Sequence, residues 1–238
     1  GTPDIIYAGD LQGNLWKFDV SSANEAEWHV AFNSQPLYTA TSDTASVDQS
    51  ITTAPLVRMR RGSGKGGLMV AFGTGRNYTE GDRTDTTQQT FYSIWDRANY
   101  QVRSDDSSKV VEFESDSTPK APSAGSGRDN LVARTFNANP IEIVEGGGDN
   151  QYWNMEEQQN ELDYGNGHLG WYFDLPGDDE FASSERIIRN PRFFRGGSNV
   201  IEILSDRPAS GEIVEGESCA PPPVQPKAWR TLLGIEMG

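Results

Sequence analysis

The stretch Asp4–Val20, DIIYAGDLQGNLWKFDV, decides the fold. Residues 5–8 are apolar and favour a strand, residues 9–14 (GDLQGN) supply turn-forming Gly, Asp and Asn, and residues 15–18 resume an apolar strand. Strand, turn and strand together predict a β-hairpin. The sequence enters this pattern without a methionine or a signal peptide, and both of its ends look truncated, so we expect it to be a piece of a larger protein.

The rest of the chain repeats this style of sequence. Short apolar segments alternate with Gly, Pro, Asn, Asp and Ser, and helical periodicity is almost absent. A second hairpin is predicted from Ser50–Arg60 and Leu68–Phe72, which are joined by a glycine-rich tip. Further strands are predicted at residues 91–96, 110–113, 131–136, 141–144, 170–175, 185–193, 199–204 and 229–237. Only one short helix is predicted, at Trp153–Leu162. Because strands dominate, the chain is predicted to be all-β.

Three polar segments interrupt the strands. Residues 103–130 and 145–167 are rich in polar residues and glycine, and residues 205–227 form a Pro-rich loop that contains Cys219. We interpret all three as excursions from one domain, of which residues 1–238 form a part. Cys219 is the only cysteine, which excludes an internal disulfide framework and a Cys-based zinc site; an inert thiol and a bridge to a cysteine elsewhere both remain open.

Charge and hydropathy exclude several functions. The net charge is −15, and such an acidic surface repels nucleic-acid phosphates and anionic lipids. No apolar run approaches the ~18 residues that a membrane-spanning helix needs. We therefore predict a protein that binds neither nucleic acid nor membrane surfaces and has no membrane span.

An aromatic residue before an acid recurs in the strands, in LWKFD, YSIWD and WYFD. Repetition at spacings of several tens of residues is typical of a β-propeller, whose four-stranded blades surround an axis. A β-sandwich is the alternative, but it needs a stricter spacing than these insertions allow. If a blade takes roughly 40 to 50 residues plus loops, the chain supplies only three or four blades. A closed ring would need more chain or a partner.

Five motifs in order carry a family resemblance. They are YAGDLQGNLWKFD, ITTAPLV, GLMVAFGTGRNY, DRTDTTQQTFYSIWD, and GWYFDLP followed by SERII. Together they cover most of residues 4–188, and they closely resemble the C-terminal propeller of the PilC/PilY family of type IV pilus biogenesis and tip-adhesin proteins. The tail, with ILSDRP and AWRTLLGIEM, resembles the closing blade of that family. The long polar insertions depart from the family pattern.

The resemblance implies a non-enzymatic, extracellular protein at the pilus tip or outer membrane. Members of the family act with minor pilins to promote pilus assembly, oppose retraction and mediate attachment to a host or abiotic surface. Their propeller follows a variable N-terminal region that often contains a von Willebrand A-like domain. The expected partners are therefore minor pilins, the N-terminal domain of the same protein, and the surface that is gripped.

The resemblance also implies a calcium site. The family propeller often carries an acidic D-x-D-x-D-G-x-x-D loop just before the YAGD strand. If Gly1 takes the sharp-turn position, Thr2 offers a backbone carbonyl and Asp4 the last carboxylate. Because Ca²⁺ takes about six to eight oxygens, the remaining ligands would lie upstream. The local sequence alone favours a simpler role for Asp4, the start of a strand, whereas the resemblance favours the calcium role in the intact protein.

Two other functional classes remain open. The A-G-D-x-x-G-N-x-W run is similar to the tryptophan-docking repeat of quinoprotein dehydrogenases, which hold pyrroloquinoline quinone and calcium in a related propeller. No catalytic acid or stacking cluster can be assigned here, so this enzymatic interpretation is disfavoured. An extracellular carbohydrate-binding propeller is the other alternative.

The remaining polar residues favour structural roles. Asp10, Gly13 and Asn14 suit a hairpin turn, and residues 73–78 (GTGRNY) lack the P-loop pattern. His29 and His168 are too far apart in sequence to suggest a metal pair, and an ordinary surface or loop role is predicted for both. Two acidic segments, at residues 156–163 and 178–180, are interpreted as solvated loops rather than cation sites. The aromatic residues Trp16, Trp95 and Trp171 are predicted to pack between blades. No Ser/His/Asp or Cys/His catalytic set can be proposed.

Overall fold

The structure is a computed structural model. It describes residues 4–42, 47–60, 67–97, 100–102, 110–113, 128–137, 141–143, 150–152, 154–156, 159–175, 184–195, 198–208, 226–236 and 238. Thr2, Cys219 and residues 178–180 lie outside these ranges, so the predictions made for them stay predictions. Within the described residues, no helix has the length and apolar character needed to cross a bilayer.

The first sheet is built on the predicted hairpin. Its strands are β1 (Ile5–Gly9), β2 (Asn14–Asp19), β3 (His29–Val30) and β4 (Tyr38–Thr39), and β3 and β4 both pair with β2. The link between β2 and β3 contains a short 3-10 helix, η1 (Glu25–Glu27), and α1 (Ala31–Ser34) follows β3. Within α1, Phe32 and Asn33 have φ of 58° and 55°, so this segment is a left-handed turn rather than an ordinary helix.

The turn between β1 and β2 is organised by Asp10, as the sequence predicts. The Asp10 carboxylate accepts hydrogen bonds from the backbone N–H groups of Gln12 (2.8 Å) and Asn14 (2.9 Å) and from the indole N–H of Trp16 (2.8 Å). Burial raises the pKa of Asp10, but these hydrogen bonds outweigh it and leave the pKa below its usual value. Gly13 has φ of +81°, and a Cβ there would lie 2.6 Å from a backbone oxygen.

The second sheet lies at the centre of the molecule. Its order is β10 (Val132–Ala133), β13 (Gly170–Asp174), β7 (Thr90–Asp96), β6 (Leu68–Gly73) and β5 (Leu56–Met59). Neighbours are antiparallel except β10 and β13, which are parallel. β13 pairs with β7. The chain therefore leaves the sheet after β7, passes through both polar insertions, and returns to the same sheet at β13. The predicted strands at residues 50–60 and 131–136 are shorter than expected.

The third sheet closes the chain. It contains β14 (Arg192–Phe193), β15 (Val200–Arg207) and β16 (Lys227–Gly234) in that order. The strand expected at residues 185–193 is reduced to β14 and a single bridge between Arg186 and Asp206. The loop expected at residues 205–227 is shorter than predicted, because β15 extends to Arg207 and β16 begins at Lys227.

Smaller elements lie at the edges of the polar insertions or inside them. Two separate hairpins are formed, β8 (Tyr100–Val102) with β9 (Val110–Phe113) and β11 (Ile141–Ile143) with β12 (Asn150–Tyr152). The predicted helix at Trp153–Leu162 is wrong for the described residues there, because Met155 is extended and pairs with Phe136. The only helical turn described nearby is η3 (Tyr164–Asn166), which lies after the predicted range.

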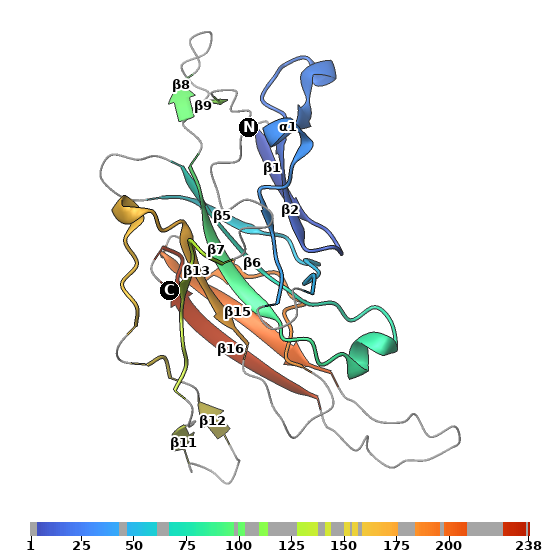
Figure 1. Cartoon of the computed structure of the whole chain (residues 1–238), viewed down its shortest axis with the longest axis vertical. Helices are drawn as coiled ribbons and strands as arrows, with labels where there is room; N and C mark the ends of the chain where they lie inside the picture. The colour runs from blue at the N-terminus through green and yellow to red at the C-terminus, as the bar shows by residue number, and fades with distance from the viewer. Residues whose placement is uncertain are drawn as a thin grey trace.

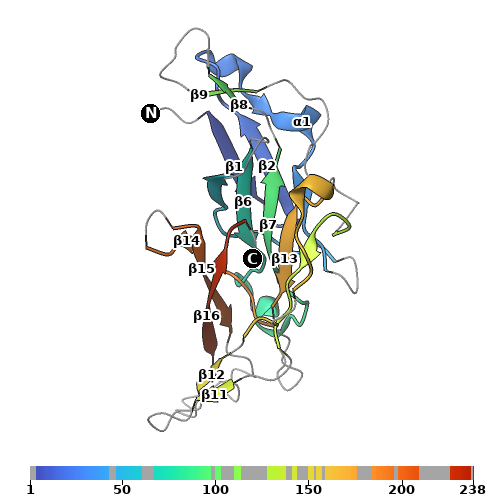
Figure 2. The ribbon, with the colours of Figure 1, turned by 90° about the vertical axis from the view of Figure 1, so that its left-hand side faces the viewer.

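The central sheet is covered on both faces. Successive side chains of a strand point to opposite faces, and in β7 the Tyr92 ring packs 5.2 Å from the Tyr38 ring of the first sheet. The next residue, Ser93, donates a hydrogen bond to the carbonyl of Ile235 beyond β16 (2.6 Å). Figures 1 and 2 show β1 and β2 on one side of β6 and β7, and β15 and β16 on the other. This stacking explains why every residue of β7 is buried.

Two glycines allow the layers to approach. A Cβ on Gly9, at the end of β1, would lie 2.1 Å from the Ile51 side chain, and a Cβ on Gly73, at the end of β6, would lie 2.5 Å from the Ile187 side chain. In both places the isoleucine N–H donates to the carbonyl of the residue after the glycine, at 2.8 and 2.9 Å. The same joint therefore occurs twice, once at each boundary between sheets.

A buried ion pair links the first and second sheets. The Lys17 ammonium of β2 donates to the Asp96 carboxylate of β7, and Tyr7 donates to the same carboxylate (2.5 Å). Lys17 and Asp96 are at most 1% exposed. Burial lowers the pKa of Lys17, and the Asp96 carboxylate opposes that shift.

Candidate functional site

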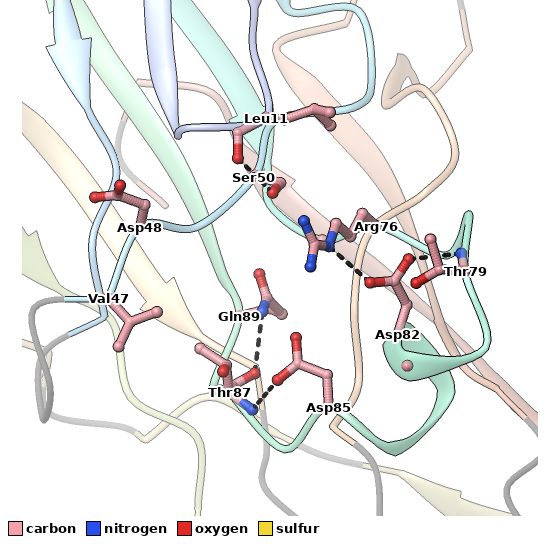
Figure 3. A pocket seen from close by; sticks show the side chains of 12 residues that line it. Leu11, Val47, Asp48, Ser50, Arg76, Thr79, Asp82, Asp85, Thr87 and Gln89 are labelled. Atoms are coloured by element: carbon pink, nitrogen blue, oxygen red, sulfur yellow. Dashed lines mark hydrogen bonds and ion pairs between the residues drawn. The ribbon is translucent and has the colours of Figure 1, made fainter.

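A polar cleft lies beside the end of the central sheet. Its volume is about 560 Å³, within the usual range for small-molecule sites. The turn of the first hairpin, residues 47–50 and the loop from Gly75 to Gln89 line it (Figure 3). That loop joins β6 to β7 and contains a 3-10 turn, η2 (Gly81–Thr84).

Arg186 holds the loop in place from beneath. Its guanidinium donates to the backbone carbonyl groups of Arg76 (2.9 Å), Asp82 and Asp85 (2.9 Å), and the residue is 1% exposed. Gly75 lies directly over it, because a Cβ there would meet the Arg186 side chain at 2.5 Å. A planar guanidinium suits this arrangement, since its donors point along several fixed directions.

Asp82 closes the outer part of the loop. Its carboxylate accepts from the backbone N–H groups of Tyr78 (2.8 Å) and Thr79 (2.9 Å) and from Arg76 Nε (2.7 Å). Burial alone would raise the pKa of Asp82, but these hydrogen bonds lower it to about 2. Asp82 is therefore ionised at neutral pH and acts as a structural acceptor.

Three polar groups remain open toward the cleft. The Gln89 amide nitrogen donates to the Thr87 carbonyl (3.0 Å), and its buried oxygen has no hydrogen-bond partner. One oxygen of Asp85 accepts from the Thr87 N–H (2.8 Å), and the other is not engaged. Arg76 is bound only through Nε, so its terminal nitrogens face the cleft (Figure 3). The cleft thus presents one donor group and two acceptor groups that are unused.

The predicted calcium ligands lie elsewhere. Asp4 stands immediately before β1, is partly exposed, and uses its backbone carbonyl to accept from Val20 (3.1 Å). Thr2 is outside the described residues. Among the residues that the structure describes, no group of three or more His, Cys, Asp or Glu side chains is placed to hold a metal ion. The Asp4 carboxylate itself makes no hydrogen bond to any residue that the structure describes. The prediction of a calcium loop that ends at Asp4 stays a prediction.

The histidines occupy ordinary surface and loop positions, and two of the three tryptophans that were predicted to pack between blades are buried. His29 is exposed in β3, and the ring nitrogen Nδ1 of His168 accepts from the backbone N–H of Asp163 (2.9 Å). Trp95 and Trp171 are buried in the central sheet, and Trp95 packs edge-on against the ring of Tyr164 at 5.6 Å. Trp16 is partly buried, and its indole N–H donates to the Asp10 carboxylate. This turn contact was not part of the prediction that Trp16 packs between blades.

Sequence reasoning missed the cleft. Asp85 and Gln89 belong to the stretch DRTDTTQQ, and Arg186 belongs to SERII. Both stretches indicate a family resemblance but no binding site. No residue spacing joins these segments, because Arg186 is 101 positions from Asp85. Only the buried Arg-to-carbonyl contacts bring them together.

The scaffold is all-β, and its stacked sheets of short strands and hairpins are those of a propeller-type protein. Residues 1–109 match the family described as the PilY1 beta-propeller domain. The crystal structure of the Pseudomonas aeruginosa PilY1 C-terminal domain is similar over 99% of this chain and 44% of that chain, with a TM-score of 0.68 and 25% identity. The predicted resemblance is therefore confirmed: the chain is similar to PilY1 propeller domains in sequence over residues 1–109 and in fold over almost its whole length.

Curated relatives are similar to part of the chain. The type IV pilus biogenesis factor PilY1 of P. aeruginosa strain PAO1 is 42% identical over 115 residues, which cover 41% of this chain and 10% of that protein. A PilY1 homolog of Xylella fastidiosa is 33% identical over 101 residues, covering 40% of this chain and 7% of that protein. The chain thus spans about a tenth or less of the length of these relatives.

Proposed function

We propose that this chain is the propeller part of a type IV pilus biogenesis factor. The observation that carries the proposal is the agreement between the PilY1 propeller family over residues 1–109 and the PilY1 C-terminal fold over almost the whole chain. The relatives are type IV pilus biogenesis factors, which supports a pilus-associated role for this chain.

The proposed mechanism is non-enzymatic presentation of surfaces. One surface contacts minor pilins or the N-terminal domain of the same protein, and another, on the long loops, contacts a host or abiotic surface. The three stacked sheets provide a rigid support, because their shared core is continuous from Leu15 in the first sheet to Leu233 in the third. The proposed location is outside the cell, at the pilus tip or outer membrane.

The test uses the native protein in its own cells. Deletion of the gene is expected to reduce surface pili and attachment, and a second deletion that disables pilus retraction is expected to restore pili but not attachment. Unchanged piliation and attachment after the first deletion would contradict the proposal. Turnover of an alcohol with an artificial electron acceptor, after reconstitution with pyrroloquinoline quinone, would instead support the quinoprotein alternative.

Calcium dependence is the finer part of the proposal. Thr2 and Asp4 would supply the last two ligands of a loop whose other carboxylates lie upstream, and the ion would fix the entry into β1. The test is thermal unfolding with calcium or EDTA, on this chain and on one extended upstream. Stabilisation of only the extended chain, reversed by EDTA, is expected. Failure of both chains to respond would remove calcium from the proposal.

A further inference from the structure

The cleft beside Gln89 contains a combination of groups that the fold leaves unused. Gln89 is 6% exposed, and its side-chain oxygen has no hydrogen-bond partner. A buried carbonyl oxygen without a partner is rare in proteins, because its desolvation is uncompensated. The orientation of the amide is fixed, since the nitrogen must face the Thr87 carbonyl that accepts from it. The oxygen therefore points into the cleft, as Figure 3 shows.

The neighbours of this oxygen restrict the kind of ligand. The unengaged Asp85 oxygen is a second acceptor beside it, and the terminal nitrogens of Arg76 face both across the cleft (Figure 3). A purely cationic group would satisfy the acceptors but would meet the like charge of Arg76. A purely anionic group would satisfy Arg76 but would meet Asp85 and the oxygen of Gln89. The matching ligand both donates and accepts hydrogen bonds and carries no net charge.

Hydroxyl groups meet this requirement, since each donates one hydrogen bond and accepts others. A sugar places several hydroxyls side by side, so that some donate to Asp85 and Gln89 while others accept from Arg76. A peptide is recognised mainly at a strand edge or in an apolar groove, and this cleft is lined by turns and loops. Two exposed apolar side chains in the lining, Leu11 (54%) and Val47 (44%), can cover the C–H face of a sugar ring.

We propose that the cleft lined by Arg76, Asp85 and Gln89 binds a neutral saccharide. The cleft should prefer neutral sugars to acidic ones. A uronic acid would bring a negative charge close to the carboxylates of Asp85 and Asp48, which also line the cleft and would repel it. This inference rests on the cleft alone. It is independent of the pilus-associated role, since a saccharide site can fail while pilus biogenesis stands.

The test begins with the labelled 238-residue chain on an array of neutral and acidic glycans. The neutral glycan that binds best is then titrated by nuclear magnetic resonance, with the backbone amide signals of Thr79 and Thr87 as reporters. We expect saturable binding to neutral glycans, at least fivefold weaker binding to the matched uronic acid, and shifts at both reporters.

Two cleft variants and one control outside the cleft test whether binding occurs there. Gln89→Met removes the acceptor at nearly constant size, and Asp85→Asn keeps the contact with the Thr87 N–H while replacing the second oxygen by a donor. Each is expected to weaken binding at least fivefold. Glu25→Gln, in the exposed turn η1 of the first sheet, removes an equal charge outside the cleft and is expected to leave affinity within twofold.

Several outcomes would overturn the proposal. They are no saturable binding to any neutral glycan, equal or tighter binding of acidic glycans or of a basic peptide, and unchanged affinity in the two cleft variants. The well-dispersed spectrum of each variant is checked first. If one cleft variant does not fold, the other decides, and Arg76→Met, at a half-exposed position, provides a third with the same expected loss.

Discussion

The two boundaries between sheets use the same joint but hold their buried cations differently. At the first boundary Gly9 lies under Ile51, and at the second Gly73 lies under Ile187. Elsewhere on the first boundary, Lys17 of β2 is paired with the Asp96 carboxylate of β7. Beside the second joint, Arg186 donates to backbone carbonyl groups of the cleft loop.

The difference shows which property each boundary depends on. The first boundary contains opposite charges out of contact with water, so it depends on charge pairing. The second boundary contains the positive charge of Arg186, which is held by backbone carbonyl dipoles, so it depends on the fixed directions of the guanidinium donors. The turn at the first joint is closed around Asp10, whereas the longer loop at the second joint, supported by Arg186, forms the cleft.

Removing the carboxylate at the first boundary is expected to have the largest effect. Asp96→Ala takes away the acceptor of a buried ammonium group, which typically costs about 3–5 kcal/mol of unfolding free energy. Urea unfolding measures this loss. Arg189→Ala, which breaks the exposed pair between Arg189 and Asp206, is the matched control and should lose less than about 1 kcal/mol. Equal losses would show that burial does not distinguish the two pairs.

The second boundary is expected to respond to pH through Glu185. Burial raises the pKa of Glu185 to about 7, although Ser205 donates to its carboxylate and Arg207 lies nearby. The folded state therefore holds a proton that the unfolded state, with an ordinary pKa near 4.5, releases. This group's contribution to stability is present below about pH 4.5 and is lost as the pH rises to about 7, by at most about 3 kcal/mol.

Glu185→Gln mimics the protonated acid and tests this expectation. In urea unfolding at pH 4 and pH 8, the variant should match the native chain at pH 4 and exceed it at pH 8. A variant that is less stable at both values would show instead that Glu185 is held as an anion by Arg207.

The shared glycine joint predicts similar losses at both boundaries. Gly9→Ala and Gly73→Ala would each place a methyl group against an isoleucine side chain, and overpacking of this kind typically destabilises by about 1–3 kcal/mol. Gly234→Ala is the control, because its Cβ would have no neighbour closer than 4.0 Å. Thermal unfolding should separate the two joint variants from the control. A loss at only one joint would break the equivalence of the boundaries.

The smallest expected effect separates charge from geometry at the second boundary. Arg186→Lys keeps the positive charge but cannot direct donors to three carbonyl groups at once, so a loss of about 1–2 kcal/mol is expected. The amide spectrum of residues 76–85 should change with it. An unchanged spectrum and stability would mean that any cation suffices there.

Local sequence patterns predicted most of the strands. The hairpin of residues 4–20, the pairing of β5 with β6, and the buried strand β7 follow from alternating apolar segments and turn residues, which are local properties. The helix expected at Trp153–Leu162 failed because helix-tolerant residues form a helix only when packing supports it, and Met155 instead pairs with Phe136. The extent of β15 and β16 was also missed, because their long pairing stabilises residues that look loop-forming on their own.

The sequence by itself determined the all-β class, the Asp10 turn and the family resemblance, since these depend on neighbouring residues and on ordered motifs. Only the tertiary structure decided that β13 completes the sheet of β7, that Lys17 pairs with Asp96, and that Arg186 shapes the cleft. The physical reason is distance along the chain. Contacts between residues 79 or 101 positions apart form when stacked sheets bury polar groups that must find partners, and no local pattern records which partner that will be.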